Sequence, residues 1–368
     1  MVHTSAPGKQ MLAGEWSVLE LGNPCIVAAV NKRVHVEIEE SEEISITVDD
    51  FNIKDVKADF NGKQLAWKNA DDKEKEKLIF IKGAIETALQ YLGDYKSFKL
   101  RSWGEESQIV VDGVAKKVGF GSSAACVVAT VSGLLKFNGY DIDCRESNDI
   151  IYKLSTIAHY FAQGKVGSAF DVAASTYGGA TVYKRFDPIW LTKRIESETV
   201  KKIAEEDWPY FFVEELKVSD DFILLVGWTK ESASTSAMVK QMDNFKNNDF
   251  NEYKRIYDGI SKLVCELIDA WKVNDQEEIL ALIKKNEEYL RELGQKSGVN
   301  IETKELKQLV DIANENGAAG KLSGAGGGDC GIAVCFSSDV VEKIIEEWQN
   351  AGLYPLDVSI DYDGVREE

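Results

Sequence analysis

Two kinds of hydrophobic pattern divide the first half of the chain. In some segments β-branched residues dominate and partly alternate with polar ones, which predicts strands. In others apolar residues recur three and four positions apart, which predicts helices, and the pattern over 78–93 stops at Gly93 as a glycine-capped helix would. Strands are expected at 26–39, 44–51 and 178–186, and helices at 78–93, at 122–137 and from Ser147 or Asn148 to Gly164.

The second half carries longer amphipathic helices. Strands are expected at 222–228, 331–336 and 356–362, and helices at 250–274, 276–293, 302–316 and 340–352. Residues 187–220 combine Pro188, Pro209 and a short charged helix, so we expect the domain junction there, with 1–190 and 191–368 as the two domains. Strands and helices mixed in this order indicate two α+β domains.

Length and charge narrow the possible functions. A chain of 368 residues exceeds the size at which one hydrophobic core usually stops growing, which again favours two domains. Since no long uncharged apolar run and no secretory pattern occur, we expect a cytoplasmic protein without a membrane partner. Three histidines and six scattered cysteines predict no thiolate or imidazole metal cluster. The net charge of −19 argues against nucleic acid, but not against a small phosphorylated ligand.

A glycine-rich stretch, GFGSSAAC (119–126), stands where the helix 122–137 should begin. Gly119 and Gly121 permit a tight turn with inward-pointing amides, and the helix start adds positive potential at the same point. Such a turn binds phosphate, and its serine hydroxyls can ligate magnesium. An ordinary helix cap would use the same residue types, so the stretch leaves both interpretations open.

Three other stretches have unusual composition. Residues 321–334 hold five glycines within eight positions, a cost in backbone entropy that close approach to a ligand or another loop explains better than a hairpin does. Lys9 lies in an expected turn of small residues and is either a surface lysine or part of a site. Asp171 lies among Ala, Phe and Val, where a carboxylate needs a partner, either as a helix cap or with a metal ion or a lysine.

Taken in order, four stretches resemble the GHMP kinases, a family that includes galactokinase and the homoserine, mevalonate and phosphomevalonate kinases. They are SAPGKQMLAGEWSVL (5–19), GFGSSAAC (119–126), KVGSAFDVAASTYGG (165–179) and KLSGAGGGDCG (321–331). The resemblance implies an N-terminal domain like domain 2 of ribosomal protein S5, a ferredoxin-like C-terminal domain, and ATP with Mg²⁺. The third stretch, residues 224–239 and the lysine in KVGFGSSA look most like phosphomevalonate kinases, which implies phosphomevalonate as the acceptor. Mevalonate kinase, another small-molecule kinase of the family and a non-catalytic binding protein are the alternatives.

The resemblance also implies roles for single residues. The expected catalytic residues are Lys9, Lys117 and Asp171. The expected contacts of ATP are Gly119, Gly121, Ser122, Ser123 and Ala124, and those of magnesium are Ser122, Ser123 and Asp171. The expected contacts of the acceptor are Lys165, Ser168, Ser234, Thr235, Ser323, Gly324, Ala325 and Gly326. Ser234 and Thr235 would equally suit a cap of the next helix.

The implied acceptor, a phosphate monoester, shapes these roles. Its second ionisation lies at about pH 6, so the attacking oxygen needs no strong base. Asp171 is therefore expected to organise magnesium or nearby lysines, and Lys9 to neutralise charge that develops between donor and acceptor. Mevalonate kinases carry a glutamate as a second metal ligand eleven residues before this aspartate, where this chain has Tyr160 beside His159. Serine, ATP oxygens and water would then complete the metal site, in a monomer or a homodimer.

Overall fold

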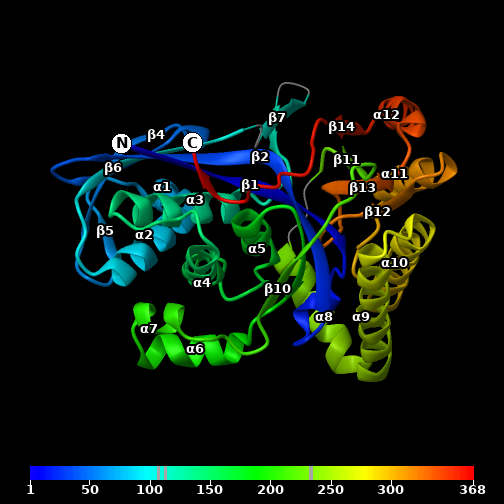
Figure 1. The fold of residues 1–368 in the computed structure, drawn as a ribbon, viewed down its shortest axis with the longest axis horizontal. Helices are drawn as coiled ribbons and strands as arrows, with labels where there is room; N and C mark the ends of the chain where they lie inside the picture. The colour runs from blue at the N-terminus through cyan, green and yellow to red at the C-terminus, as the bar shows by residue number, and fades with distance from the viewer. Residues whose placement is uncertain (106–107, 112–113, 232–234) are drawn as a thin grey trace.

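The computed structural model describes residues 1–105, 108–111, 114–231 and 235–368. For residues 108–111, 114–117 and 235–236 it describes the backbone alone. Within the described residues the strands form a large sheet, a small sheet and a hairpin. The hairpin pairs β7 (Gln108–Val111) with β8 (Val114–Lys117). Figure 1 shows the large sheet above one group of helices and the small sheet beside it with a second group.

The large sheet contains both ends of the chain. Its strands follow the order β10-β9-β2-β6-β3-β4-β5, and β1 pairs with β2 and β15. All pairs are antiparallel except β3 with β6. The bounds are β1 (Val2–Ala13), β2 (Pro24–Glu40), β3 (Ile44–Val48), β4 (Ile53–Phe60), β5 (Leu65–Trp67), β6 (Phe98–Gly104), β9 (Ala180–Lys184), β10 (Phe212–Leu216) and β15 (Arg366–Glu367).

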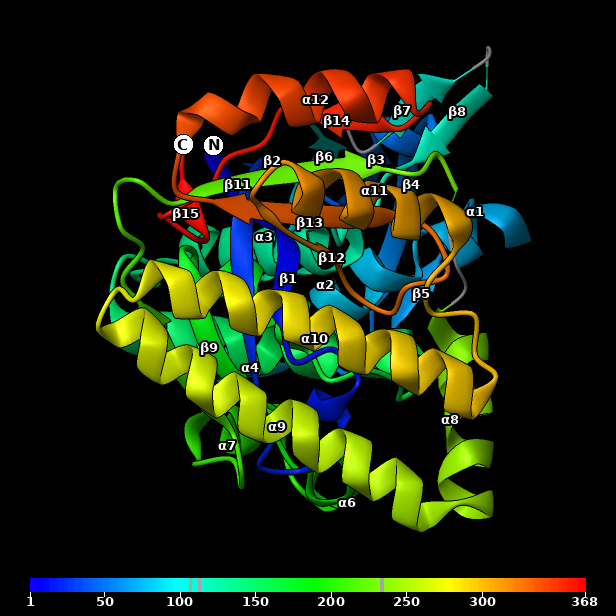
Figure 2. The same cartoon turned by 90° about the vertical axis from the view of Figure 1, so that its right-hand side faces the viewer.

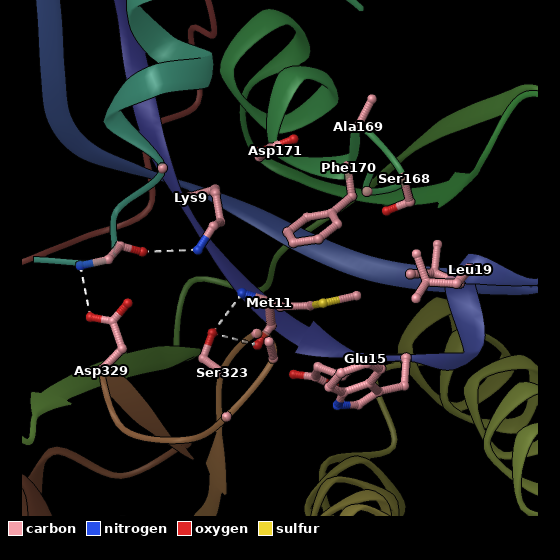
Figure 3. A pocket seen from close by; sticks show the side chains of 18 of the residues that line it. Lys9, Met11, Glu15, Leu19, Ser168, Ala169, Phe170, Asp171, Ser323 and Asp329 are labelled. Atoms are coloured by element: carbon pink, nitrogen blue, oxygen red, sulfur yellow. Dashed lines mark hydrogen bonds between the residues drawn. The ribbon is translucent and has the colours of Figure 1, made fainter. Parts of the chain in front are cut away.

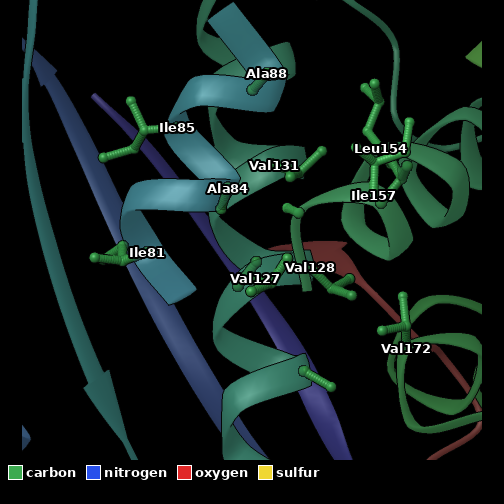
Figure 4. Packing of buried hydrophobic residues seen from close by; sticks show 14 of the residues in the cluster. Ile81, Ala84, Ile85, Ala88, Val127, Val128, Val131, Leu154, Ile157 and Val172 are labelled. Atoms are coloured by element: carbon green, nitrogen blue, oxygen red, sulfur yellow. The ribbon is translucent and has the colours of Figure 1, made fainter. Parts of the chain in front are cut away.

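Helices cover one face of the large sheet and close the first core. Ile81 of α2, Val128 of α3 and Leu154 of α4 are among the buried side chains that meet there (Figure 4). Removing such apolar surface from water is the main driving force that holds α3 against the sheet. The helices are α1 (Asp72–Lys77), α2 (Ile79–Leu92), α3 (Ser122–Phe137), α4 (Arg145–Ala162), α5 (Phe170–Tyr177), α6 (Pro188–Ser197) and α7 (Val200–Glu205).

The small sheet has the antiparallel order β12-β13-β11-β14. Its strands are β11 (Ile223–Trp228), β12 (Ala319–Leu322), β13 (Cys330–Cys335) and β14 (Tyr354–Leu356). The helices are α8 (Thr235–Asn248), α9 (Phe250–Lys272), α10 (Gln276–Ser297), α11 (Lys304–Glu315) and α12 (Val341–Asn350), and short 3-10 helices lie at Ser17–Leu19, Asp49–Phe51 and Ser338–Val340. Figure 2 shows the long helices α9 and α10 lying side by side below this sheet.

Most predicted elements are confirmed within a few residues, and α3 has the predicted bounds. Helix α4 begins earlier than predicted, after Cys144, because the Ser147 hydroxyl donates to the Asp141 carbonyl instead of capping the helix. The prediction of a turn around Lys9 is wrong, since Lys9 lies within strand β1, next to a bulge between Pro7 and Gly8.

The strand predicted at 356–362 is also wrong. β14 ends at Leu356, and within the described residues 357–362 the one strand-type pairing is the bridge between Val30 and Ile360. The reason is that this segment leaves the small sheet and returns to the large one, where buried Arg33 pairs with Asp361. The C-terminal residues thereby tie the two parts of the molecule together.

The chain passes from the large sheet to the small one between Leu216 and Ile223. Residue 190 lies within α6, and side chains beyond it, such as Leu191 of α6 and Ile203 of α7, belong to the first core. The division between residues 190 and 191 stays a prediction. Among the described helices, none has the length and apolar character needed to cross a bilayer.

Candidate active site

A cavity of about 410 Å³ opens where three segments distant in the sequence meet. Strand β1 contributes Lys9, the turn before α3 contributes Gly119 and Gly121, and the glycine-rich loop between β12 and β13 contributes Ser323 and others (Figure 3). The start of α5 closes another side. Two of these segments belong to the large sheet or its helices and one to the small sheet, so the cavity lies at their junction.

Lys9 is fixed to the turn before α3 by two hydrogen bonds. Its backbone N–H donates to the Phe120 carbonyl over 2.8 Å, and its ammonium donates to the Gly119 carbonyl over 2.9 Å. A Cβ added at Gly8 would lie 2.9 Å from that Phe120 oxygen, so the close approach requires glycine. The ammonium also lies 6.0 Å from the centre of the Phe170 ring. Lys9 is therefore a held, half-buried cation at the cavity.

The turn before α3 depends on Gly121. This residue has a φ of +76° and precedes the helix without a side-chain cap, so the serines are not caps but the first two helical residues. A Cβ at Gly121 would lie 3.1 Å from Lys9 Cγ and 3.8 Å from Asp171 Cβ. Gly121 thus lies between the two charged residues. The N–H groups of Ser122 and Ser123, which begin the helix, suit an anion, whereas the Ala124 N–H already donates to the Gly121 carbonyl over 3.0 Å.

Two polar side chains of α4 and α3 meet below this turn. The Ser123 hydroxyl lies 3.2 Å from His159 Nε2, and the buried His159 ring stacks on Phe80 with centroids 5.0 Å apart. Tyr160 is also buried and packs edge-on against Phe186. His159 therefore does more than pack, because it orients the Ser123 side chain.

Asp171 lies in the first turn of α5 and lines the cavity. The residue before the helix, Ala169, has a φ of +62° and offers no side-chain cap. One Asp171 carboxylate oxygen accepts from the N–H of Val172, 3.0 Å away, a local bond that is not the usual cap of a helix. Among the described residues, no ion pair joins Asp171 to Lys9. The two opposite charges face the same cavity.

A buried charge cluster supports the cavity from the small sheet. Glu15 forms a fully buried ion pair with Lys321, and Glu287 of α10 accepts from the Leu322 N–H over 2.9 Å. Next to them, the Ser323 hydroxyl accepts from the Met11 N–H over 2.8 Å and donates to its carbonyl over 3.1 Å. These contacts anchor β1 to the loop that follows β12.

Burial raises the pKa of Glu287 to about 8, against the opposing effect of Lys321. The ordinary pKa of a glutamate is 4.5, so between pH 4.5 and about pH 8 Glu287 loses its proton in the unfolded chain but keeps it in the folded protein. The stability of the fold therefore falls as pH rises through this window. Glu287→Gln keeps an acceptor for the Leu322 N–H but cannot ionise. Its free energy of unfolding relative to that of the wild type should therefore rise by about 2–3 kcal/mol from pH 6 to pH 9. Denaturant unfolding at both pH values measures this. The exposed Glu288→Gln should show no such gain; an equal gain would contradict the assignment.

Comparisons with known proteins cover both parts of the chain. Residues 80–179 match the model of the GHMP kinases N terminal domain, and residues 266–353 match that of the GHMP kinases C terminal domain. The phosphomevalonate kinase of Streptomyces sp. (strain CL190) is 30% identical over 370 residues, which is 98% of this chain and 97% of the relative. The chain belongs to the GHMP kinase family.

Solved structures agree with this assignment. The Lin0012 protein from Listeria innocua matches with a TM-score of 0.89 and 31% identity over 100% of this chain and 99% of that one. The phosphomevalonate kinase of Streptococcus pneumoniae in complex with phosphomevalonate and AMPPNP matches with a TM-score of 0.82 and 26% identity, over 98% of this chain and all of that one. The expected α+β fold class of a GHMP kinase is confirmed.

The residues predicted for this GHMP kinase lie in different places. The cavity lining contains Lys9, Gly119, Gly121, Ser168, Asp171, Ser323, Gly324, Ala325 and Gly326. Ser122, Ser123 and Ala124 follow in the first turn of α3. Lys165 is exposed, and its ammonium lies 5.3 Å from the centre of the Phe161 ring, outside the lining. Ser234 lies outside the described residues. Of Lys117 and Thr235 the structure describes the backbone but not the side chain. The assigned roles stay predictions.

Sequence reasoning places the loop from Ser323 to Asp329 at the acceptor side but gives neither Asp329 nor Glu15 a role of its own. Glu15 lines the cavity next to Lys321, and Asp329 accepts from the Gly119 N–H over 2.8 Å. A signal for Asp329 was present, because it is a charged residue at the end of a glycine run. Its partner lies 210 positions earlier, which no local pattern reveals.

Proposed function

We propose that the protein is a phosphomevalonate kinase. It transfers the γ-phosphoryl group of ATP to (R)-5-phosphomevalonate and forms 5-diphosphomevalonate and ADP in the mevalonate pathway. The main support is the match over nearly the whole of both chains to a phosphomevalonate kinase in complex with phosphomevalonate and AMPPNP. The cavity with Lys9 and Asp171 supplies the matching chemistry.

The nucleotide phosphates bind at the turn before α3. The amides of Ser122 and Ser123 and the positive end of the helix favour an anion there. Gly119 and Gly121 let the backbone approach the phosphates closely. Because the apolar side chains of α3 are buried in the first core, the fold itself holds the start of this helix in place.

Magnesium fits the donor set beside this turn. Asp171 and the hydroxyls of Ser122 and Ser123 offer hard oxygen ligands, and Mg²⁺ typically uses one or two protein oxygens with phosphate oxygens and water. Among the described residues there is no group of three or more His, Cys, Asp or Glu side chains that could hold a metal by themselves. When bound, the ion would neutralise phosphate charge.

Phosphoryl transfer then requires mainly positioning and positive potential. An oxygen of the acceptor phosphate attacks the γ-phosphorus, the bond to the bridging β–γ oxygen breaks, and ADP leaves. Lys9, whose ammonium is fixed by the Gly119 carbonyl, stabilises the charge on the transferring group. Asp171 keeps the lysine and the metal in place rather than removing a proton.

The acceptor binds between the start of α5 and the loop from Ser323 to Gly326. The buried Ser168 hydroxyl lines the cavity and has no hydrogen-bond partner among the described residues, so it is available to a ligand. The proposal also assigns acceptor contacts to Lys165, Ser234 and Thr235 and a catalytic role to Lys117. We further propose a cytoplasmic monomer or homodimer.

The test is an acceptor assay on the wild-type protein. ADP release is followed with ATP and either phosphomevalonate or mevalonate, each with and without Mg²⁺, and the diphosphate product is identified by ³¹P NMR. We expect kcat/KM for phosphomevalonate to exceed that for mevalonate by about a hundredfold or more, with turnover requiring Mg²⁺. Turnover with mevalonate alone, or with neither acceptor, would refute the proposal.

A further inference from the structure

Asp329 reaches from the small sheet to the turn before α3. Its carboxylate accepts from the Gly119 N–H over 2.8 Å, and the carbonyl of the same glycine accepts from the Lys9 ammonium over 2.9 Å. Figure 3 shows these two bonds as a continuous chain from Asp329 to Lys9. Both polar backbone groups of Gly119 are thereby occupied, one by each part of the molecule.

The backbone of Asp329 is held in an unfavourable conformation. Its φ of +64° lies in the left-handed region, which glycine adopts freely and other residues avoid. Three hydrogen bonds fix it there: its N–H donates to the Glu231 carbonyl over 2.8 Å, and its carbonyl accepts from the N–H and the hydroxyl of Thr229 over 2.9 and 3.0 Å. Such conformations persist only where the surroundings enforce them, and they gather at functional sites.

The fit between the two loops is tight. A Cβ added at Gly119 would lie 1.8 Å from a carboxylate oxygen of Asp329, so the contact requires glycine at that position. The neighbours Gly326, Gly327 and Gly328 also have positive φ angles. A fourth glycine would suit position 329 sterically, yet the chain has a carboxylate there, aimed at the turn that precedes α3.

We propose that Asp329 is a positioning residue, which holds Gly119 so that the glycine carbonyl keeps the Lys9 ammonium at the cavity. The role of Lys9 in this statement rests on the proposed function. Because Asp329 satisfies the Gly119 N–H, the phosphates are left to the amides of the first turn of α3. The docking of the small sheet on the large one thereby also places the lysine.

Two substitutions and a matched control test this role. Asp329→Gly removes the carboxylate and suits the left-handed backbone, and Asp329→Asn keeps a weaker, neutral acceptor. The control is Asp55→Gly, because Asp55 is also an aspartate with positive φ, 50°, but is exposed and far from the cavity lining. All three variants should keep Tm within about 3 °C of the wild type. In the two glycine variants relief of backbone strain offsets the entropy that glycine adds to the unfolded chain, and asparagine tolerates the left-handed backbone.

We expect kcat to fall about tenfold or more in Asp329→Gly, to take an intermediate value in Asp329→Asn and to stay unchanged in Asp55→Gly. Pulse acetylation of the protein without substrates, read by mass spectrometry, should modify Lys9 about threefold faster in Asp329→Gly, at an intermediate rate in Asp329→Asn and at the wild-type rate in Asp55→Gly. The acetylation needs no turnover, so it tests the inference even if the wild type does not phosphorylate phosphomevalonate. Unchanged acetylation of Lys9 would overturn the proposal. If Asp329→Gly proves unstable, Asp329→Asn decides: wild-type kcat together with wild-type acetylation would also overturn it.

Discussion

Lys9→Met is expected to lower kcat by about a hundred- to a thousandfold and to change the dissociation constant of ATP by less than about fivefold. The ammonium is held at the cavity by the Gly119 carbonyl, where it can meet the charge of the transferring group more strongly than that of the bound substrates. Methionine keeps an unbranched apolar stem beside Phe170 and removes the ammonium. Steady-state kinetics and equilibrium titration with a non-hydrolysable ATP analogue measure the two quantities.

A control variant separates loss of charge from loss of packing. Lys184 of β9 also carries an ammonium near an aromatic ring, 5.7 Å from the centre of Phe212, and does not line the cavity. Lys184→Met should therefore leave kcat unchanged. Equal losses of ATP affinity and kcat in Lys9→Met would mean that this lysine only binds nucleotide.

Local patterns predicted the elements that depend on local signals. The bounds predicted for helix α3 agree with the structure, because two glycines precede a long apolar run there. Strand β1 was not, since it is buried on both faces and shows no alternation, and Pro7 and Gly8 at its bulge look like a turn. The segment 356–362 alternates like a strand, yet it leaves the small sheet and forms one bridge, between Ile360 and Val30 of the large sheet.

The same distinction applies to the site. The glycine-rich stretches and Asp171 were found because their composition is costly or unusual without a ligand. Glu15 and its partner Lys321 are 306 positions apart in the sequence. Asp329 and Gly119 are 210 positions apart. Such contacts arise only when the small sheet docks on the large one, so they are tertiary information that residue types do not carry.

Asp171→Asn is expected to lower kcat by about a hundredfold or more, with a higher Mg²⁺ concentration needed for half-maximal turnover. Asparagine keeps an oxygen that can accept from the Val172 N–H, so the start of α5 should form as before. What it removes is the negative charge that faces Lys9 across Gly121 and that suits a metal ion. Thermal unfolding and the Mg²⁺ dependence of kcat measure the two effects separately.

The matched control is Asp187→Asn, because Asp187 caps α6 through the N–H groups of Ile189 and Trp190 and asparagine caps equally well. Both variants should unfold at the wild-type temperature, and only Asp171→Asn should lose turnover. If Asp171→Asn kept wild-type kcat and Mg²⁺ dependence, the carboxylate would serve only the local bond to Val172. The metal would then depend on serine and phosphate oxygens, and phosphoryl transfer between two anions would rely on Lys9 and Mg²⁺ without a contribution from this carboxylate.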